Sequence, residues 1–176
     1  MADTAKAVLK PNSIYKIGEV AIEVYFKVDE TELESDALIA TIAKKGKWTE
    51  RLSTPLNVYI KIKVGNHYHD ELKKVDNFEP LTAAYILGDR RKPLPAFKDI
   101  IFVNGVMPMA EVMTQALRCA DEEDCRTVVL PMMAFTKSDA PLGNTKVLRE
   151  IAGELELAVG SLALRTVKTI KLVYPS

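Results

Sequence analysis

The sequence predicts an α/β domain with three layers, in which helices cover both faces of a mixed β-sheet. Three observations support this fold class. Strand patterns dominate the first part of the chain, strands and helices alternate afterwards, and no internal repeat or interdomain linker interrupts the sequence. The length of 176 residues favours a single domain. We expect residues 1–12 to form a flexible N-terminal arm and residues 13–176 to form that domain.

The strand predictions rest on hydrophobic patterning. Residues 20–27 alternate between two faces, which is typical of a strand with one face more buried than the other. Residues 37–42 are nearly all apolar, as in a central strand covered on both faces. Residues 56–64 alternate again and predict a half-exposed strand. The remaining strand candidates are residues 81–87, 100–103, 127–133 and 167–174.

The helix predictions rest on spacing and capping. Pro108 suits a first helical turn, and apolar side chains recur at helical spacing over 109–120. Asn144 or Thr145 suits the N-cap of a second helix. The apolar face of this helix, which we expect to cover the sheet, consists of Leu148, Ile151, Ala152, Leu155 and Val159. A shorter helix is predicted over 68–74.

Composition excludes several classes of protein. Hydrophobic residues make up 48% of the chain and charged residues 27%, as in an ordinary globular protein. The 24 basic residues equal the 24 acidic ones, which argues against a dedicated nucleic-acid-binding protein. No apolar run approaches the roughly 20 residues that a membrane-spanning helix needs. The opening MADTAKAVLK lacks the apolar core of a secretory signal, so we expect a cytoplasmic protein without membrane contact.

Residues 24–39, VYFKVDETELESDALI, resemble the opening of the macro domain family. In that family a strand ends in a Gly-Asp-Ile-Thr turn, and a second Asp follows seven residues after the first and starts the next strand. Asp29, Thr31 and Asp36 occupy the corresponding positions here. The order of the later strands and helices agrees with the family as well, so the resemblance covers about residues 20–174.

The resemblance implies a macro-like fold and the binding of ADP-ribose or a related nucleotide, in some members with hydrolysis of ADP-ribose esters. It also implies a role for Asp29, because the matching acid in the family accepts a hydrogen bond from the adenine amino group. The alternative for Asp29 is a turn aspartate that caps its own backbone. Both interpretations remain open from the sequence.

Two ligand-site motifs of the family are replaced in this chain. The family's Asn-Ala-Ala-Asn, whose asparagines meet the distal ribose and help to position water, becomes ATIA at residues 40–43. Apolar side chains cannot supply the donors and acceptors of an amide. The family's second phosphate loop has Ser-Thr-Gly, two residues and another Gly, whereas this chain has AFTKSD at residues 134–139.

The second replacement affects phosphate binding. Glycines let backbone N–H groups approach a diphosphate closely, but Thr136 adds a β-branched side chain and Asp139 adds a negative charge. Lys137 can offset that charge. The ligand-binding candidates are Asp29, Thr136, Lys137 and Ser138, in a site that we expect to be degenerate. We assign no catalytic residue and no cofactor.

Three other residue patterns give weaker indications of a functional site. His67 and His69 form a His-x-His pair, but a zinc site needs three or four ligands, so we assign no metal. Cys119 and Cys125 are expected to be ordinary buried or half-buried thiols, since a catalytic cysteine needs a histidine base. The basic run at residues 89–92 is read as a solvated loop, with single-stranded RNA binding as a weaker alternative.

The leading functional hypothesis is a non-enzymatic macro-like module for binding or assembly. The alternative is a nucleotide or ADP-ribose-type ligand-binding domain with a remodelled site, with or without hydrolysis. The expected partner is another protein or a second copy of the chain, contacted through Trp48 and the strand predicted at 56–64, which we place at a sheet edge.

Overall fold

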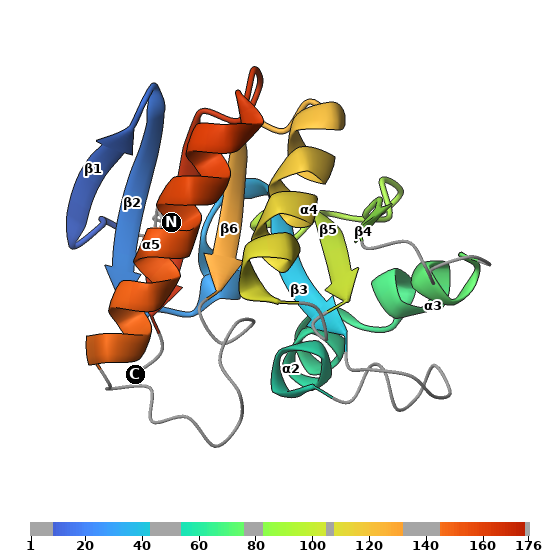
Figure 1. Cartoon of the computed structure of the whole chain (residues 1–176). Coiled ribbons are helices and arrows are strands. Elements are labelled where there is room, and N and C mark those ends of the chain that lie inside the picture. The colour runs from blue at the N-terminus through green and yellow to red at the C-terminus, as the bar shows by residue number, and fades with distance from the viewer. Residues whose placement is uncertain (1–8, 43–53, 76–82, 105–107, 132–144, 175–176) are drawn as a thin grey trace.

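The structure is a computed structural model, and it describes residues 9–42, 54–75, 83–104, 108–131 and 145–174. Within these ranges, seven strands form a single sheet in the order β1-β2-β7-β6-β3-β5-β4. Figure 1 shows the arrangement. The strands are β1 (Ser13–Ile17), β2 (Val20–Phe26), β3 (Ser35–Ile42), β4 (Ala83–Ile86), β5 (Phe97–Asn104), β6 (Thr127–Pro131) and β7 (Thr169–Tyr174).

The sheet is mixed, as the sequence predicts. Strands β2, β7, β6, β3 and β5 run parallel to one another, and the edge strands β1 and β4 run antiparallel to their neighbours. The carboxyl ends of the five parallel strands therefore meet at one edge of the sheet. In open α/β sheets this edge is where ligands usually bind.

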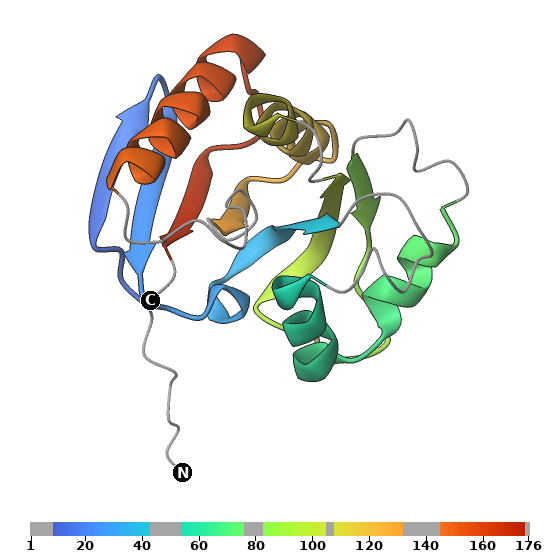
Figure 2. The ribbon, with the colours of Figure 1, turned by 60° about the horizontal axis from the view of Figure 1, so that its bottom comes forward.

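Helices cover both faces of the sheet (Figure 2). The helices α4 (Met109–Glu122) and α5 (Thr145–Leu162) lie on one face. The helices α2 (Pro55–Val64) and α3 (His67–Lys73) lie on the other face, together with the short 3-10 helix η1 (Glu30–Glu32). The three-layer α/β/α fold predicted from the sequence is confirmed.

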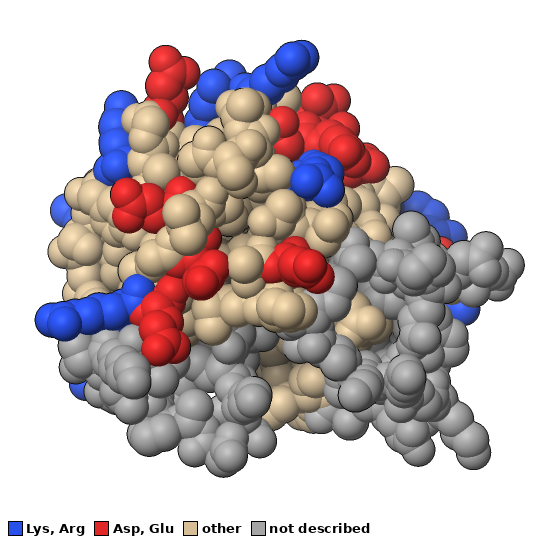
Figure 3. Space-filling view, viewed as in Figure 1, with Lys and Arg blue, Asp and Glu red and all other residues tan. Residues whose placement is uncertain are grey.

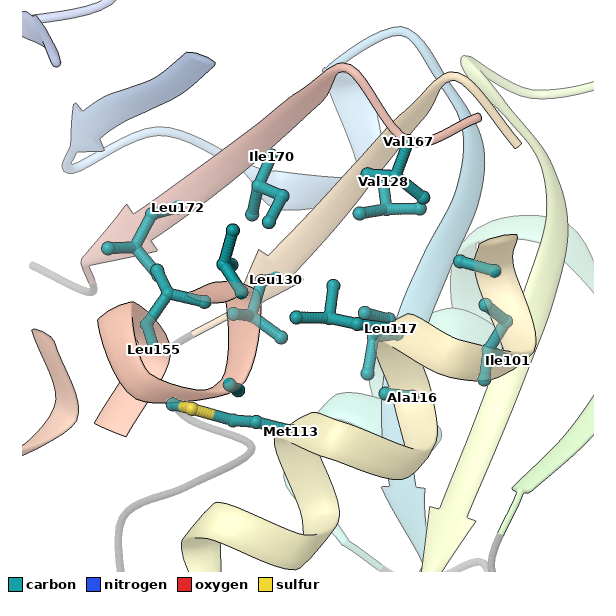
Figure 4. Close-up of a cluster of buried hydrophobic side chains, with 14 of the residues drawn as sticks. Ile101, Met113, Ala116, Leu117, Val128, Leu130, Leu155, Val167, Ile170 and Leu172 are labelled. Atoms are coloured by element: carbon teal, nitrogen blue, oxygen red, sulfur yellow. The ribbon is translucent and has the colours of Figure 1, made fainter. Parts of the chain in front are cut away.

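The larger hydrophobic core lies between the sheet and the helices α4 and α5. Figure 4 shows Met113, Leu117 and Leu155 pointing from the helices toward side chains of β6 and β7. Ile151 and Leu155 are completely buried, and Val159 is nearly so, which confirms these three members of the predicted apolar face of α5. Burial of one such side chain stabilises the fold by about 1.5–3 kcal/mol. The side chain of Leu148 lies outside the part that the structure describes.

The prediction of a strand over residues 56–64 is wrong, because this segment is the helix α2. Thr54 caps the helix by accepting a hydrogen bond from the Asn57 N–H, and Pro55 stands in the first turn. Proline suits that position because its fixed φ is helical and its missing N–H is not needed there. The buried side chains Leu56 and Ile60 are four residues apart and face the sheet, so a helical spacing is present beneath the apparent alternation.

This correction also removes the sheet edge that we had placed at residues 56–64. The outermost strands of the sheet are β1 and β4. Strand β1 is itself absent from the sequence prediction, and it pairs with β2 through a two-residue turn in which Gly18 has a φ of 59°. Asn12 continues this contact, since its N–H donates to the Val24 carbonyl over 2.7 Å. Most of the predicted arm, residues 1–8, lies outside the described ranges.

No helix in the described part of the chain is both long and apolar enough to cross a membrane.

Candidate functional site

The candidate site is the edge of the sheet at which the parallel strands end. Five chain segments follow these strand ends, and the loop between β2 and η1, which carries Asp29, is described by the structure. The segments 43–53, 105–107 and 132–144 lie outside the described residues. The predictions for Trp48, Thr136, Lys137 and Ser138 fall on those segments. Of the predicted site residues, the described part of the chain contains Asp29.

Asp29 is the N-cap of η1. Its Oδ1 atom accepts a hydrogen bond from the Thr31 N–H over 2.9 Å and another from the Thr31 hydroxyl over 2.6 Å. This is the local turn interaction that the sequence left open as an alternative to ligand binding. A short acidic side chain before a helical turn satisfies backbone donors that have no partner within the turn.

The second oxygen of Asp29 is held from the helix α2. The Tyr59 hydroxyl donates to Oδ2 over 2.5 Å, and the Lys63 ammonium group lies 3.0 Å from the same atom. Lys63 also contacts the Glu32 carboxylate at 3.1 Å. Tyr59 and Lys63 are one turn apart, so they reach Asp29 from the same face of α2. We call Asp29, Glu32, Tyr59 and Lys63 the Asp29 clasp.

The clasp uses the full accepting capacity of the Asp29 carboxylate. An ionised carboxylate has about four lone-pair positions on its two oxygens, and four donors from Thr31, Tyr59 and Lys63 occupy them. Partial burial raises the pKa of Asp29, but these hydrogen bonds together outweigh burial and lower the pKa to about 2. The contact with Asp29, followed by that with Glu32, raises the pKa of Lys63. Asp29 and Lys63 are therefore both charged at neutral pH.

Asn57 brings a carboxamide to the carboxyl end of β3. Its side chain is fully buried, and its Nδ2 group donates to the Thr41 carbonyl over 2.8 Å. The Oδ1 atom has no hydrogen-bond partner in the described structure. Sequence reasoning missed Asn57 because the segment was read as a strand. The Thr-Pro pair at residues 54 and 55 is the signal that could have placed Asn57 in a first helical turn.

Asp36, the second Asp of the family resemblance, lies near the amino end of β3, at the opposite ends of the parallel strands from the candidate site. One of its oxygens accepts hydrogen bonds from the backbone N–H groups of Arg126 and Thr127 over 2.8 and 3.1 Å. Lys98 lies 3.5 Å from the other oxygen. Burial raises the pKa of Asp36, but the two backbone hydrogen bonds and Lys98 lower it overall. Asp36 therefore ties the start of β3 to β6 and does not face the candidate site.

The two histidines of the His-x-His pair diverge. The Nε2 atom of His67 lies 3.0 Å from the Leu87 carbonyl oxygen, whereas His69 is buried with its ring 5.8 Å from that of Phe102. Burial lowers the pKa of His69, so its ring is neutral at pH 7. Across the described ranges, no group of three or more metal-ligating side chains is close enough to hold a metal ion.

The cysteines and the basic loop are engaged elsewhere in the fold. Burial raises the pKa of the Cys119 thiol to about 12 and that of Cys125 to about 11, so both thiols are protonated at neutral pH. Arg90 pairs with the buried Asp99 at 2.9 Å, and Arg91 pairs with Asp89 at 2.9 Å. Both arginines of the loop, which the sequence offers as the weaker RNA-binding alternative, thus have carboxylate partners within the chain.

No protein-family model and no curated protein sequence matches this chain. Comparison with solved structures gives a different result. A macrodomain mutant from Oceanobacillus iheyensis superposes with a TM-score of 0.70, covering 93% of this chain and 89% of that one at 14% identity. The chain has the macrodomain fold. The macro domain of ganglioside induced differentiation associated protein 2 supports the same fold, with a TM-score of 0.66, 14% identity and coverage of 94% and 83%.

A third solved structure carries a ligand. The Trypanosoma brucei macrodomain in complex with ADP-ribose has a TM-score of 0.62 and 13% identity, and the alignment covers 86% of this chain and 62% of that one. The fold predicted from the resemblance is thereby confirmed. At 13–14% identity these comparisons show the fold alone. Whether the chain binds a ligand has to be inferred from its own residues.

Proposed function

We propose that this protein is a non-enzymatic binding or assembly module built on the macrodomain fold, with a degenerate ADP-ribose site. The observation that carries the proposal is the Asp29 clasp. A ligand amino group that approached Asp29 would need to displace Tyr59 or Lys63, because four donors already fill the carboxylate. A displaced Lys63 would lose its 3.0 Å contact with the Asp29 carboxylate.

Sequence replacements at two further positions support the same proposal. The ATIA segment provides no side-chain amide at residues 40–43. The buried Asn57 uses its amide nitrogen on the Thr41 carbonyl, and its fully buried side chain offers no accessible surface to a ligand. Catalysis on an ADP-ribose ester would also need a positioned water, and the two asparagines that serve this purpose in the family are absent from this stretch.

The proposed partner is a protein, either a different chain or a second copy. The outer face of α2 supports this part of the proposal. Val58 is 44% exposed and Ile62, one turn further on, is 78% exposed. We keep Trp48 as a partner candidate, residues 1–12 as an arm attached to the single domain, and a cytoplasmic location, which the two free cysteines support.

Calorimetry with ADP-ribose tests the proposal. We expect the wild type and Asp29→Ala to give no saturable heat up to about 1 mM ligand, which corresponds to binding weaker than about −4 kcal/mol. We also expect no release of ADP-ribose from an ADP-ribosylated carboxylate ester. Micromolar binding that Asp29→Ala abolishes would overturn the degenerate site and would favour the alternative, a nucleotide-binding domain with a remodelled site.

A further inference from the structure

A groove lies on the α5 face of the sheet, between the strands β1, β2 and β7 and the helix. It has a volume of about 530 Å³, which is within the range of small-molecule sites. Its walls come from β1, β2, β7 and α5, so the groove is separate from the clasp, which lies on the face covered by α2. Its lining includes Tyr15, Phe26 and Tyr174 from the strands and Arg149, Gly153 and Glu156 from the helix.

The strand wall of the groove is aromatic and open to solvent. Phe26 and Tyr174 stand side by side at the ends of β2 and β7, with ring centroids 4.9 Å apart and planes inclined by 27°. Phe26 is 46% exposed, and Tyr15 on β1 is 40% exposed. Exposed aromatic faces of this kind bind planar rings by stacking, at about 1–3 kcal/mol per base.

The helix that lines the groove has small residues at the centre of the groove and a charged residue at each end. Arg149, Ala152, Gly153 and Glu156 follow the spacing i, i+3, i+4 and i+7, which places them on one stripe of α5. A Cβ atom added at Gly153 would meet no atom within 4 Å. The small residues leave space above the helix between the two charged ones. Figure 3 shows acidic side chains over α5, with basic side chains and uncharged surface on the side of β1 and β2.

Each of the two charged residues of the groove lies near different aromatic side chains. Helix α5 lies between the parallel strands β6 and β7 in the chain, so it runs back from their carboxyl edge. Arg149, in its first half, therefore lies toward Phe26 and Tyr174. Glu156 lies toward Tyr15, and its charge adds to burial in raising the pKa of Tyr15. At 1.5 Å per residue, the two charged residues are about 10 Å apart along the helix.

We infer that this groove is a second ligand site, which takes a nucleoside monophosphate with its phosphate at Arg149 and its base amino edge at Glu156. The guanidinium group has no ion pair or hydrogen bond within the described structure, and it matches a phosphate in charge and geometry. The Glu156 carboxylate accepts hydrogen bonds only, so it suits a base that presents an amino group. Tyr15, which lies toward Glu156, supplies the face for the base, and the stacked pair of Phe26 and Tyr174 lines the end that holds the ribose and the phosphate. This inference is independent of the proposed function.

The test is a titration of the full chain with AMP, followed through the backbone amide signals of α5 and β1. We expect saturable shifts with a dissociation constant below about 1 mM. Adenosine, which lacks the phosphate, and IMP, which lacks the amino group, should each bind about tenfold more weakly. Arg149→Gln should weaken AMP binding by a similar factor, and Glu156→Gln should weaken AMP but not IMP.

Gly153 provides a variant that separates the groove from the fold. Gly153→Leu should fill the groove and abolish AMP binding, while the melting temperature stays the same or rises, because glycine is a poor helix former. Gly153→Ala, Arg118→Gln on α4 and Glu154→Gln are the matched controls, and we expect them to keep AMP binding. Asp29→Ala should keep it as well.

Two results would overturn the inference. One is the absence of saturable shifts up to about 10 mM AMP, a binding free energy weaker than about −3 kcal/mol. The other is AMP binding that survives Gly153→Leu and Arg149→Gln but is lost in Asp29→Ala, which would place the nucleotide at the clasp. That second result would also contradict the proposed function, whereas the first would leave it intact.

Discussion

Removal of the Asp29 side chain should destabilise the domain by about 2 kcal/mol. Asp29→Ala deletes the cap of η1, which is worth about 1 kcal/mol, and a hydrogen bond from Tyr59 to a charged acceptor, worth about 1 kcal/mol at this exposed position. It also deletes a half-exposed ion pair with Lys63, worth at most about 1 kcal/mol. These contributions overlap because one carboxylate makes all of them. For a chain of this length, 2 kcal/mol lowers the melting temperature by about 4–8 °C.

Urea unfolding at neutral pH measures this effect, with an unchanged m-value as evidence that the unfolded state is the same. A double-mutant cycle with Lys63→Met should give a coupling energy of about 0.5–1 kcal/mol. Asp70→Ala is the matched control, because Asp70 is exposed and its ion pair with Lys73 is long, at 3.9 Å. A loss in Asp29→Ala no larger than that in Asp70→Ala would refute the clasp as a structural element.

The clasp also predicts a pH dependence with a defined sign. The pKa of Asp29 is about 2 in the folded state, below its ordinary value of 3.8. A lowered pKa means that the stabilising contribution is complete above about pH 4 and is lost as the pH falls toward 2. Solvent screening of this partly exposed group limits the contribution to about 1 kcal/mol. The stability difference between wild type and Asp29→Asn should therefore shrink over that interval, and a constant difference would contradict the assignment.

Three further predictions concern the core, the buried amide and the partner surface. Ile151→Asp should abolish cooperative unfolding, since an unpaired buried charge costs several kcal/mol, whereas Leu157→Asp on the 68% exposed side of the same helix should be nearly neutral in thermal melts. Asn57→Asp should destabilise more than Asn57→Ala in urea unfolding, because a buried carboxylate would face the Thr41 carbonyl; equal losses would contradict the geometry at β3. Ile62→Glu should reduce any self-association seen by sedimentation over a roughly hundredfold concentration range, and an oligomer that it leaves intact would place the interface elsewhere.

Much of the fold could be predicted from the sequence because its strands and long helices carry strong periodic patterns. The nearly continuous apolar run of β3 is typical of a strand covered on both faces, and the helical spacing on α5 is typical of a helix with one buried face. The segment at residues 56–64 was ambiguous, because its β-branched residues alternate while its buried residues follow a helical period. The Thr54 cap and Pro55 favour the helix over the strand. Local capping can therefore outweigh the preference of β-branched side chains for strands.

The candidate site was predictable only in part. The spacing of Asp29 and Thr31 identified the turn, and the structure shows the Asp29–Thr31 contact. Tyr59 and Lys63 could not be found, because they lie about 30 residues further along the chain, on a helix that had been read as a strand. The groove at α5 was equally hidden, since β1 carries no clear strand pattern and the pairing of Phe26 with Tyr174 depends on the order of strands in the sheet.

The central claim, that the chain's own donors occupy Asp29, is tested most directly by the pKa of the Asp29 carboxyl group. An NMR titration of the side-chain carboxyl carbon, with and without ADP-ribose, measures it at a single atom. We predict a value of about 2 in both cases and no change of the Asp29 signal when ADP-ribose is added at neutral pH. A pKa near the ordinary 3.8, or a shift of the Asp29 signal that saturates with ADP-ribose, would contradict the account.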